Sequence, residues 1–177
     1  MKVLLTGGAG FIGSCMLWRL NKAGIDDIIV VDHLGASDKW KNLVRKRFED
    51  YFDKEKFLDI LEKGSLNRSI DTVIHLGACT STTEHDATYM MKNNYVYTRK
   101  IAEWALANKK RFLYASSAAT YGNGENGYSD MDEATPNLTP LNIYGYSKHF
   151  FDLWVLKNNL QKEFAGFKFF NVFGPNE

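Results

Sequence analysis

Short apolar segments alternate with longer segments of helical periodicity along this chain. Residues 2–6 are apolar almost throughout, as is typical of a strand that is covered on both faces. In residues 11–23 the apolar side chains, among them Phe11 and Leu20, recur at the spacing of one buried helix face, and Gly24 follows as a helix stop. The chain therefore begins with a predicted strand followed by a predicted helix.

The same alternation continues to the end of the sequence. Strands are expected at 2–6, 28–32, about 48–52, 71–76, 111–115 and 167–172, and helices at 11–23, 38–46, 54–63, 86–108 and 144–161. Residues 122–143 contain glycine, asparagine, aspartate and two prolines and are expected to form a loop. Strands that alternate with helices imply right-handed crossovers. The predicted fold class is α/β, a doubly wound parallel sheet.

Three glycines, Gly7, Gly10 and Gly13, follow the first predicted strand and open the first predicted helix. In such a turn the first glycine permits the tight bend, the second lets a diphosphate approach the backbone, and the third lets helix and strand pack closely. The first N–H groups of the helix then point at the anion. Asp32 ends the second predicted strand, close to the spacing of about 20 residues for an acidic residue that binds a ribose hydroxyl. These features predict a Rossmann-like, NAD(P)-binding domain over residues 1–177.

A second group of residues suits redox chemistry. Tyr144 and Lys148 lie four residues apart on one face of a predicted helix, and Ser117 follows a predicted strand. A free tyrosine, with a pKa of about 10, is a poor base near neutral pH, and a neighbouring ammonium group favours the phenolate. The serine is expected to hold a substrate oxygen while the tyrosine exchanges a proton with it and hydride moves to or from a nicotinamide. Tyr146 is the rival base, but no lysine follows it at the same spacing.

Composition limits the expected partners and location. Apolar residues make up 45% of the chain and charged residues 24%, which allows a globular core. The formal net charge is +1, so neither a nucleic acid nor a membrane partner is expected. The two cysteines, both in predicted buried elements, lack metal-ligand spacing, so no metal is expected. Because the chain begins with its first strand and has no apolar run near the roughly 20 residues of a membrane helix, a cytoplasmic location is expected.

Taken together, these features resemble the extended short-chain dehydrogenase/reductase family over essentially the whole chain. The resemblance is carried by long and unusual strings at residues 77–84, 89–95, 114–122 and 169–175. Within the family, the strings are most similar to the epimerases that invert one carbon of a nucleotide-linked heptose, an ADP-heptose used for lipopolysaccharide. The resemblance implies a nucleotide-sugar substrate, a tightly held NADP cofactor with NAD as the alternative, and a homo-oligomer, namely a pentamer.

The resemblance also assigns roles to individual residues. Leu76 departs from the family pattern, which has an acidic residue there, so its cofactor contact is expected through the backbone only. The catalytic residues implied are Ser117, Tyr144 and Lys148, and the substrate-binding residues are Ser81 and Asn171. The cofactor-binding residues implied are Gly7, Gly10, Phe11, Ile12, Gly13, Asp32, His33, Lys39, Lys54, Leu76, Gly77, Ala78, Cys79, Thr80, Asn93, Lys148 and Val172.

The choice between the two nicotinamide dinucleotides depends on charge. Asp32 argues for NAD, because a carboxylate repels the 2′-phosphate of NADP. Lys39 and Lys54, with His33, offset that repulsion, and the resemblance favours NADP. We therefore expect NADP to be preferred.

Other functions stay open. A nucleotide-sugar 4,6-dehydratase needs acidic groups directly after the strand-end serine, where this chain has Ala118 and Ala119, so dehydration is disfavoured. A UDP-hexose 4-epimerase fits the general motifs. A non-catalytic dinucleotide-binding protein would keep the glycines, but it has no reason to retain the serine, tyrosine and lysine together.

The resemblance finally implies a region that this sequence does not contain. In the family a second catalytic base, a lysine, lies a few residues beyond the Gly174-Pro175 segment, and most nucleotide-sugar contacts lie further on. The sequence ends at Glu177. From the sequence we expect a chain that is truncated before its C-terminal substrate domain. This chain is expected to bind a dinucleotide but not to turn over its sugar substrate efficiently.

Overall fold

The computed structural model describes residues 1–66 and 69–174. Its strands are β1 (Val3–Thr6), β2 (Ile28–Asp32), β3 (Asp50–Asp53), β4 (Thr72–His75), β5 (Arg111–Ser117) and β6 (Phe164–Phe169). Its α-helices are α1 (Phe11–Lys22), α2 (Lys54–Glu62), α3 (Ala87–Met90), α4 (Tyr97–Ala107) and α5 (Ile143–Lys157). Three short 3-10 helices are η1 (Asp38–Leu43), η3 (Ala118–Tyr121) and η4 (Thr135–Asn137), and a π-helical segment, η2 (Met91–Val96), joins α3 to α4.

The strands form one sheet in the order β3-β2-β1-β4-β5-β6. The pairs β1–β2, β1–β4 and β2–β3 are parallel, with Leu5 of β1 opposite Val30 of β2 and Ile74 of β4. Strand order therefore reverses direction after β1, as in a doubly wound sheet. The predicted α/β fold with a parallel sheet is confirmed.

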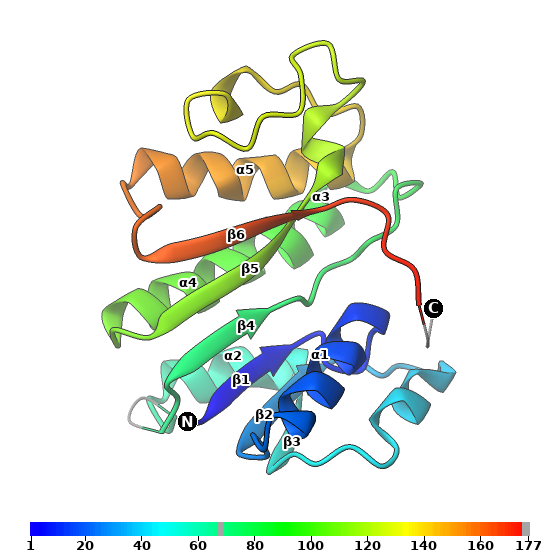
Figure 1. The fold of residues 1–177 in the computed structure, drawn as a ribbon, viewed down its shortest axis with the longest axis vertical. Helices are drawn as coiled ribbons and strands as arrows, with labels where there is room; N and C mark the ends of the chain where they lie inside the picture. Colours follow the sequence, from blue (N-terminus) through cyan, green and yellow to red (C-terminus); the bar gives the residue numbers. More distant parts are fainter. Residues whose placement is uncertain (67–68, 175–177) are drawn as a thin grey trace. The chain divides into compact units, whose positions relative to one another are not determined.

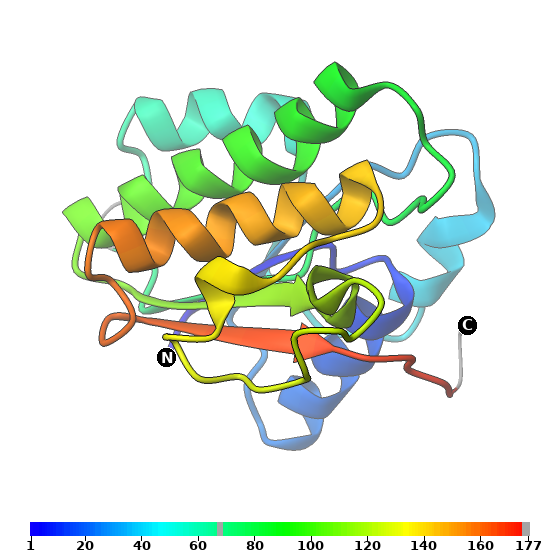
Figure 2. The same ribbon diagram turned by 90° about the horizontal axis from the view of Figure 1, so that it is seen from above.

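The chain divides into two compact units. Unit 1 comprises the described residues of 1–77, 101–113 and 172–174, and unit 2 comprises Ala78–Lys100 and Tyr114–Asn171. In unit 1, β1 is completely buried, and its side chains form a core with those of α1 and β2. Figure 2 shows α1 on one face of these strands and α2 on the other. Burial on both faces explains why β1 and β2 are apolar at nearly every position.

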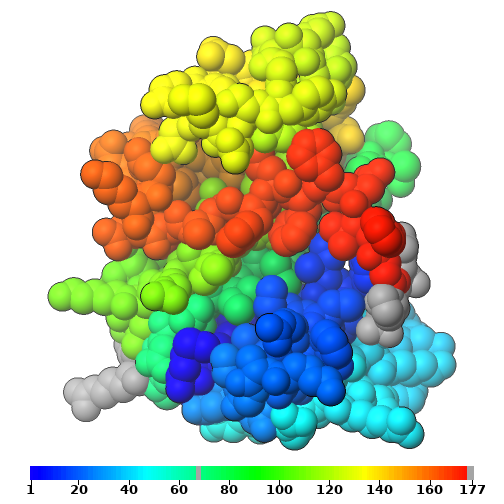
Figure 3. All heavy atoms as spheres, viewed as in Figure 1, coloured from blue at the N-terminus to red at the C-terminus, as the bar shows by residue number. Residues whose placement is uncertain are grey.

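Unit 2 is built around α5 and the two strands beside it, as Figure 1 shows. The ring of Tyr114 on β5 packs edge-on against Phe151 of α5, with 4.8 Å between ring centroids. On β6, a Cβ added at Gly166 would lie 2.6 Å from the Tyr114 ring, so the strand needs glycine at this point. The space-filling view in Figure 3 shows β6 on the surface, and Phe167 of this strand and Phe170 directly after it are exposed.

Several boundaries differ from those predicted. The helix expected at 38–46 is the short 3-10 helix η1, and the helix expected at 86–108 is interrupted by η2. The last strand begins three residues earlier than expected, because Phe164 is buried and stacks on Trp154 of α5. Asn171 and Val172 consequently lie after β6 rather than within it. Cys15 and Cys79 are half-buried rather than buried.

Within the described residues, no helix has the length and apolar character needed to cross a membrane.

Candidate active site

The glycine turn has the geometry that its sequence predicts. Gly7 has φ +71, and a Cβ there would lie 2.6 Å from the backbone nitrogen of Gly77, which follows β4. A Cβ at Gly13 would lie 1.9 Å from the carbonyl oxygen of Gly7, so only glycine lets α1 start this close to the turn. At Gly10 an added Cβ would meet a single neighbouring group, the Gly7 carbonyl at 3.2 Å. Gly7 and Gly13 thus serve backbone packing, whereas the space beside Gly10 is open.

The N-terminus of α1 is suited to an anion. Gly10 is its N-cap residue, so no side chain caps the helix, and the first turn holds no acidic residue. The first N–H groups of a helix have no partner within it and carry a partial positive charge. Phe11 and Ile12, both half-buried, begin this turn. An uncapped helix start beside an open glycine fits the diphosphate of a dinucleotide.

Asp32 lies at the end of β2 and is buried, with its carboxylate held by three groups. One oxygen accepts a hydrogen bond from the backbone N–H of Ala9 at 2.8 Å. The other accepts from the backbone N–H of His33 at 2.7 Å and lies 2.6 Å from the Lys39 ammonium group. The His33 ring in turn lies 3.2 Å from a carboxylate oxygen of Asp53, which ends β3. The structure therefore joins the glycine turn, Asp32 and Lys39 in unit 1.

Lys54 begins α2 directly after Asp53, and it is half-buried. The Asp53 carboxylate caps this helix by accepting from the backbone N–H of Glu55. Three cationic or titratable side chains expected near the adenosine end therefore follow the ends of β2 and β3, the C-terminal edge of the sheet. In open α/β sheets, ligands bind outside this edge.

The segment after β4 contains five residues of the expected cofactor set. In unit 1, the backbone N–H of Gly77 donates to the Thr6 hydroxyl at 3.1 Å, and Leu76 is half-buried. In unit 2, Cys79 is held through both of its backbone groups: its N–H donates to the Asn94 amide oxygen at 2.8 Å and its carbonyl accepts from the Asn94 amide nitrogen at 2.9 Å. The remaining residues of this set, Ala78 and Thr80, lie on either side of it, and exposed Ser81 follows.

Asn94 is a site residue that the sequence analysis missed. It is buried in the π-helical segment η2, and besides Cys79 it contacts Ser147 of α5, whose hydroxyl accepts from its amide nitrogen at 2.9 Å. The predicted residue, Asn93, is half-exposed and donates to the carbonyl of Tyr89. A π-helical turn inside an α-helix is a frequent feature of functional sites, but periodicity in the sequence does not reveal it.

Ser117, Tyr144 and Lys148 all belong to unit 2. Ser117 ends β5, and its hydroxyl accepts from the backbone N–H of Ala119 at 3.1 Å, which leaves its own proton to donate. Tyr144 is half-buried in the first turn of α5. Lys148 is buried one turn later, and its ammonium group donates to the Ala115 carbonyl of β5 at 2.7 Å. Burial lowers the pKa of Lys148 to about 8.

Gly145, between this tyrosine and lysine, permits the close approach of α5. A Cβ at Gly145 would lie 2.7 Å from the carbonyl oxygen of Ala119, in the 3-10 helix that follows Ser117. The helix that carries Tyr144 and Lys148 therefore packs directly on the segment after Ser117. Its N-terminus is capped by Asn142, whose side chain accepts from the backbone N–H of Gly145.

The last two predicted site residues follow the final strand of the sheet. Asn171 and Val172 are exposed in the segment after β6. Pro175, the last residue of the strings that carry the resemblance, lies outside the described residues. In the part of the chain that the structure describes, no group of three or more histidine, cysteine, aspartate or glutamate residues is placed to hold a metal ion.

Known proteins are similar to this chain over almost its whole length. The family described as NAD dependent epimerase/dehydratase matches residues 3–177. The chain belongs to this epimerase/dehydratase family. It is 52% identical over 174 residues to the ADP-L-glycero-D-manno-heptose-6-epimerase of Nitratidesulfovibrio vulgaris, and the match covers 98% of this chain and 54% of that protein.

Solved structures of epimerases have the same fold. The ADP-L-glycero-D-manno-heptose-6-epimerase of Helicobacter pylori matches with a TM-score of 0.82 and 30% identity, over 99% of this chain and 56% of that one. The UDP-glucuronic acid 4-epimerase of Bacillus cereus, in complex with NAD, matches with a TM-score of 0.76 and 25% identity, over 100% of this chain and 59% of that one. The chain spans about half the length of the relatives that it matches.

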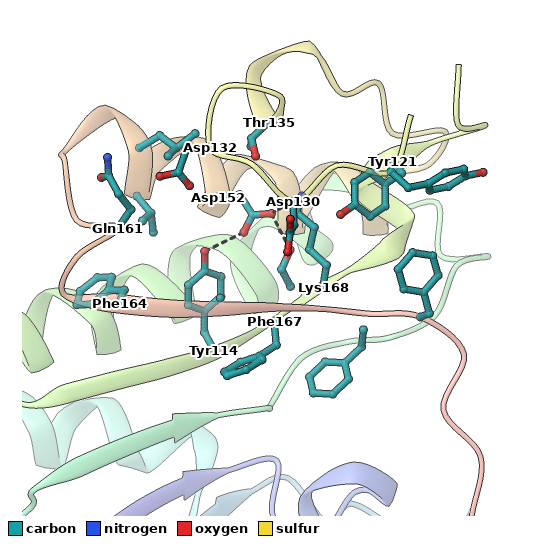
Figure 4. Close-up of a pocket in the computed structure, with 17 residues that line it drawn as sticks. Tyr114, Tyr121, Asp130, Asp132, Thr135, Asp152, Gln161, Phe164, Phe167 and Lys168 are labelled. Atoms are coloured by element: carbon teal, nitrogen blue, oxygen red, sulfur yellow. Dashed lines mark hydrogen bonds and ion pairs between the residues drawn. The ribbon is translucent and has the colours of Figure 1, made fainter. Parts of the chain in front are cut away.

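A pocket of about 640 Å³ in unit 2 of this epimerase-family chain is separate from the predicted catalytic residues. It lies beside β6 and is lined mainly by aromatic and charged side chains, as Figure 4 shows. Ser117, Tyr144 and Lys148 do not line it, whereas Ser116 and Asp152, from the same strand and helix, do. The expected chemistry is therefore not placed in this pocket.

Proposed function

We propose that this chain is the nucleotide-binding portion of an epimerase that acts at C6 of a heptose, converting ADP-D-glycero-D-manno-heptose to the L-glycero form for lipopolysaccharide core synthesis. The observation that carries the reaction class is the position of Ser117, Tyr144 and Lys148 at the end of β5 and on the first turns of α5. The heptose substrate is supported by the names of the relatives in N. vulgaris and H. pylori.

The cofactor of this proposal is NADP, with NAD as the alternative. Gly10, with the uncapped start of α1 that follows it, would hold the diphosphate. Lys39 and Lys54 would meet the 2′-phosphate of NADP. When bound, the nicotinamide would supply the hydride acceptor and donor, since no amino-acid side chain provides this chemistry. Support for a nicotinamide cofactor comes from the family and from the NAD complex of the B. cereus enzyme.

Each catalytic residue has a distinct task in this mechanism. Ser117 would donate a hydrogen bond to the C6 oxygen and orient it. Tyr144 would exchange a proton with that oxygen when hydride leaves or rejoins one face of C6, the carbon being a ketone in between, and the second base expected beyond this sequence would serve the other face. Lys148 would favour the phenolate through its positive charge. Return of hydride to the opposite face of the ketone inverts the carbon, whereas return to the same face regenerates the starting sugar.

The test is a chimera in which residues 1–177 replace the matching half of the N. vulgaris epimerase. We expect NADP-dependent equilibration of the two ADP-heptose epimers, followed as their ratio. Tyr144→Phe should slow turnover at least 100-fold, on the order of what general acid–base catalysis contributes, and leave NADP binding intact. Tyr146→Phe is the matched control on the same helix, and its rate should be normal.

Three results would count against the proposal. Normal turnover in Tyr144→Phe would remove this residue from the mechanism. Turnover of a UDP-hexose but not of ADP-heptose would favour the 4-epimerase alternative. A folded chimera that binds NADP and turns over neither sugar would favour a non-catalytic dinucleotide-binding role. The cytoplasmic location and the pentameric assembly expected from the sequence stay predictions.

A further inference from the structure

Asp152 is a buried carboxylate on α5, one helical turn after Lys148. Its Oδ1 accepts a hydrogen bond from the Tyr114 hydroxyl at 3.0 Å, and its Oδ2 accepts from the Ser116 hydroxyl at 2.6 Å. The Lys168 ammonium group of β6 lies 3.4 Å from the same Oδ2. Figure 4 shows Tyr114 and Lys168 reaching Asp152 from two different strands. One side chain of α5 is thus bound to both β5 and β6.

Lys148 and Asp152 hold the same short stretch of β5. The Lys148 ammonium group donates to the carbonyl of Ala115, and Ala115 lies between the two residues that donate to Asp152. Side chains alternate along a strand, so the side chains of Tyr114 and Ser116 share the face toward α5. Ala115, between them, contributes its backbone carbonyl, which accepts from Lys148. The two α5 residues, four apart, therefore bind three consecutive β5 residues immediately before Ser117.

The same arrangement matters for charge. Burying an ammonium group is costly unless an opposite charge is near. Burial lowers the pKa of Lys148 to about 8, and the negative charge of Asp152 acts in the opposite direction. Lys148 would hold its proton less firmly without this carboxylate.

We propose that Asp152 is a positioning residue for Lys148, which fixes α5 on β5 and supplies the negative charge that keeps the Lys148 ammonium group protonated beside Tyr144. The inference rests on the proposed function, because only a redox role for Tyr144 gives that ammonium group its use. Asp152 itself contacts no substrate in this proposal and acts through Lys148.

Other charged and titratable groups face Asp152 from each neighbouring element. Lys168 of β6 shares its Oδ2, donates to the Thr120 hydroxyl at 2.9 Å and lies over the Tyr121 ring. Burial, with the Asp152 charge, raises the pKa of Tyr114, so its hydroxyl stays a donor. Burial lowers the pKa of His149, the neighbour of Lys148 on α5. The loop after η3 contributes the carboxylates of Asp130 and Asp132 to the pocket.

These neighbours supply matched variants of the 177-residue chain. Carbon-13 labelling at lysine Cε allows the titration of each ammonium group to be followed by NMR, and the Lys148 signal is the one that Lys148→Met removes. In Asp152→Asn the Lys148 titration midpoint should fall by about one pH unit, because a nearby opposite charge is lost. In Lys168→Met the Lys148 titration midpoint should rise, because the Lys168 ammonium group no longer neutralises part of the Asp152 charge. Asp132→Asn, which removes an exposed carboxylate from the same pocket, should leave it unchanged.

The opposite signs separate an electrostatic role from a merely structural one. An unchanged Lys148 titration midpoint in Asp152→Asn would overturn the proposal. So would a fall in the midpoint that is no larger than any fall seen in the control Asp132→Asn. If Asp152→Asn does not fold, Lys168→Met decides, since it keeps the carboxylate, and an unmoved midpoint there also overturns it. NADP affinity, measured on the unchanged chain, reports separately on the proposed function, so failure of one is not mistaken for failure of the other.

Discussion

The carboxylate of Asp32 and the ammonium group of Lys39 form an ion pair of 2.6 Å at the end of β2. Asp32 is only 6% exposed, and its second oxygen accepts from the backbone N–H of Ala9 in the glycine turn. The acidic residue that favours NAD is thus already paired with a cation. Because Lys39 partly neutralises it, Asp32 repels a 2′-phosphate less than an unpaired carboxylate would.

Replacement of Lys39 should change the cofactor preference. In Lys39→Gln we expect NADP affinity to fall about tenfold, the loss of one charge-assisted hydrogen bond of about 1.5 kcal/mol, while NAD affinity changes little. Lys41→Gln is the control, because Lys41 pairs with exposed Asp38 on the same 3-10 helix. Calorimetric titration with both dinucleotides measures the effect. Equal losses of affinity for NADP and NAD would mean that Lys39 does not bind the 2′-phosphate.

Substitution of Gly10 should impair dinucleotide binding, whereas substitution of Gly13 should impair stability. Gly10→Val puts a side chain into the open space beside the start of α1, so dinucleotide binding should be lost while the fold persists. Gly13→Ala drives a Cβ into the Gly7 carbonyl, so it should lower the thermal unfolding temperature. Calorimetry and thermal unfolding of both variants separate the two effects. Unchanged affinity in Gly10→Val would place the diphosphate elsewhere.

Lys148 should make stability rise with pH in the alkaline range. Its pKa is about 8 in the folded chain, below the ordinary value of 10.5, because of burial. Between these values the unfolded chain holds a proton that the folded chain has released, so the free energy of unfolding increases with pH. Relative to Lys148→Met, it should increase by about 2 kcal/mol between about pH 7.5 and about pH 9.5. Urea unfolding at both pH values measures this, and a constant difference would contradict it.

Asn94 is expected to contribute mainly to stability, and Asn93 mainly to dinucleotide binding. Asn94→Ala leaves both backbone groups of Cys79 without their buried partner, so we expect a loss of about 3 kcal/mol in the free energy of unfolding. Asn93→Ala, at a half-exposed position one residue away, should cost less than about 1 kcal/mol and instead weaken dinucleotide binding. Urea unfolding and NADP titration of the pair measure this. A larger stability loss in Asn93→Ala would contradict it.

Much of the fold follows from patterns within a few residues. The apolar run before Gly7 predicts β1, and the structure confirms it because that strand is buried on both faces. The positive φ of Gly7 and the tight packing at Gly13 agree with the roles that their spacing predicts. The last strand, β6, begins at Phe164 rather than at the predicted residue 167, because Phe164 is buried against Trp154 of α5, a contact between separate elements that periodicity does not reveal.

The sequence by itself determined which residues can carry the chemistry: a glycine turn, a strand-end serine, and a tyrosine and lysine at helical spacing. Only the tertiary structure decided what each of them meets. The two hydroxyl groups that donate to Asp152 lie 36 and 38 residues away in the chain, and Asn94 bonds to Cys79 and Ser147, which lie 15 and 53 residues away. Periodicity records which face of an element is buried, whereas a hydrogen bond between distant residues forms only once packing has brought both elements together.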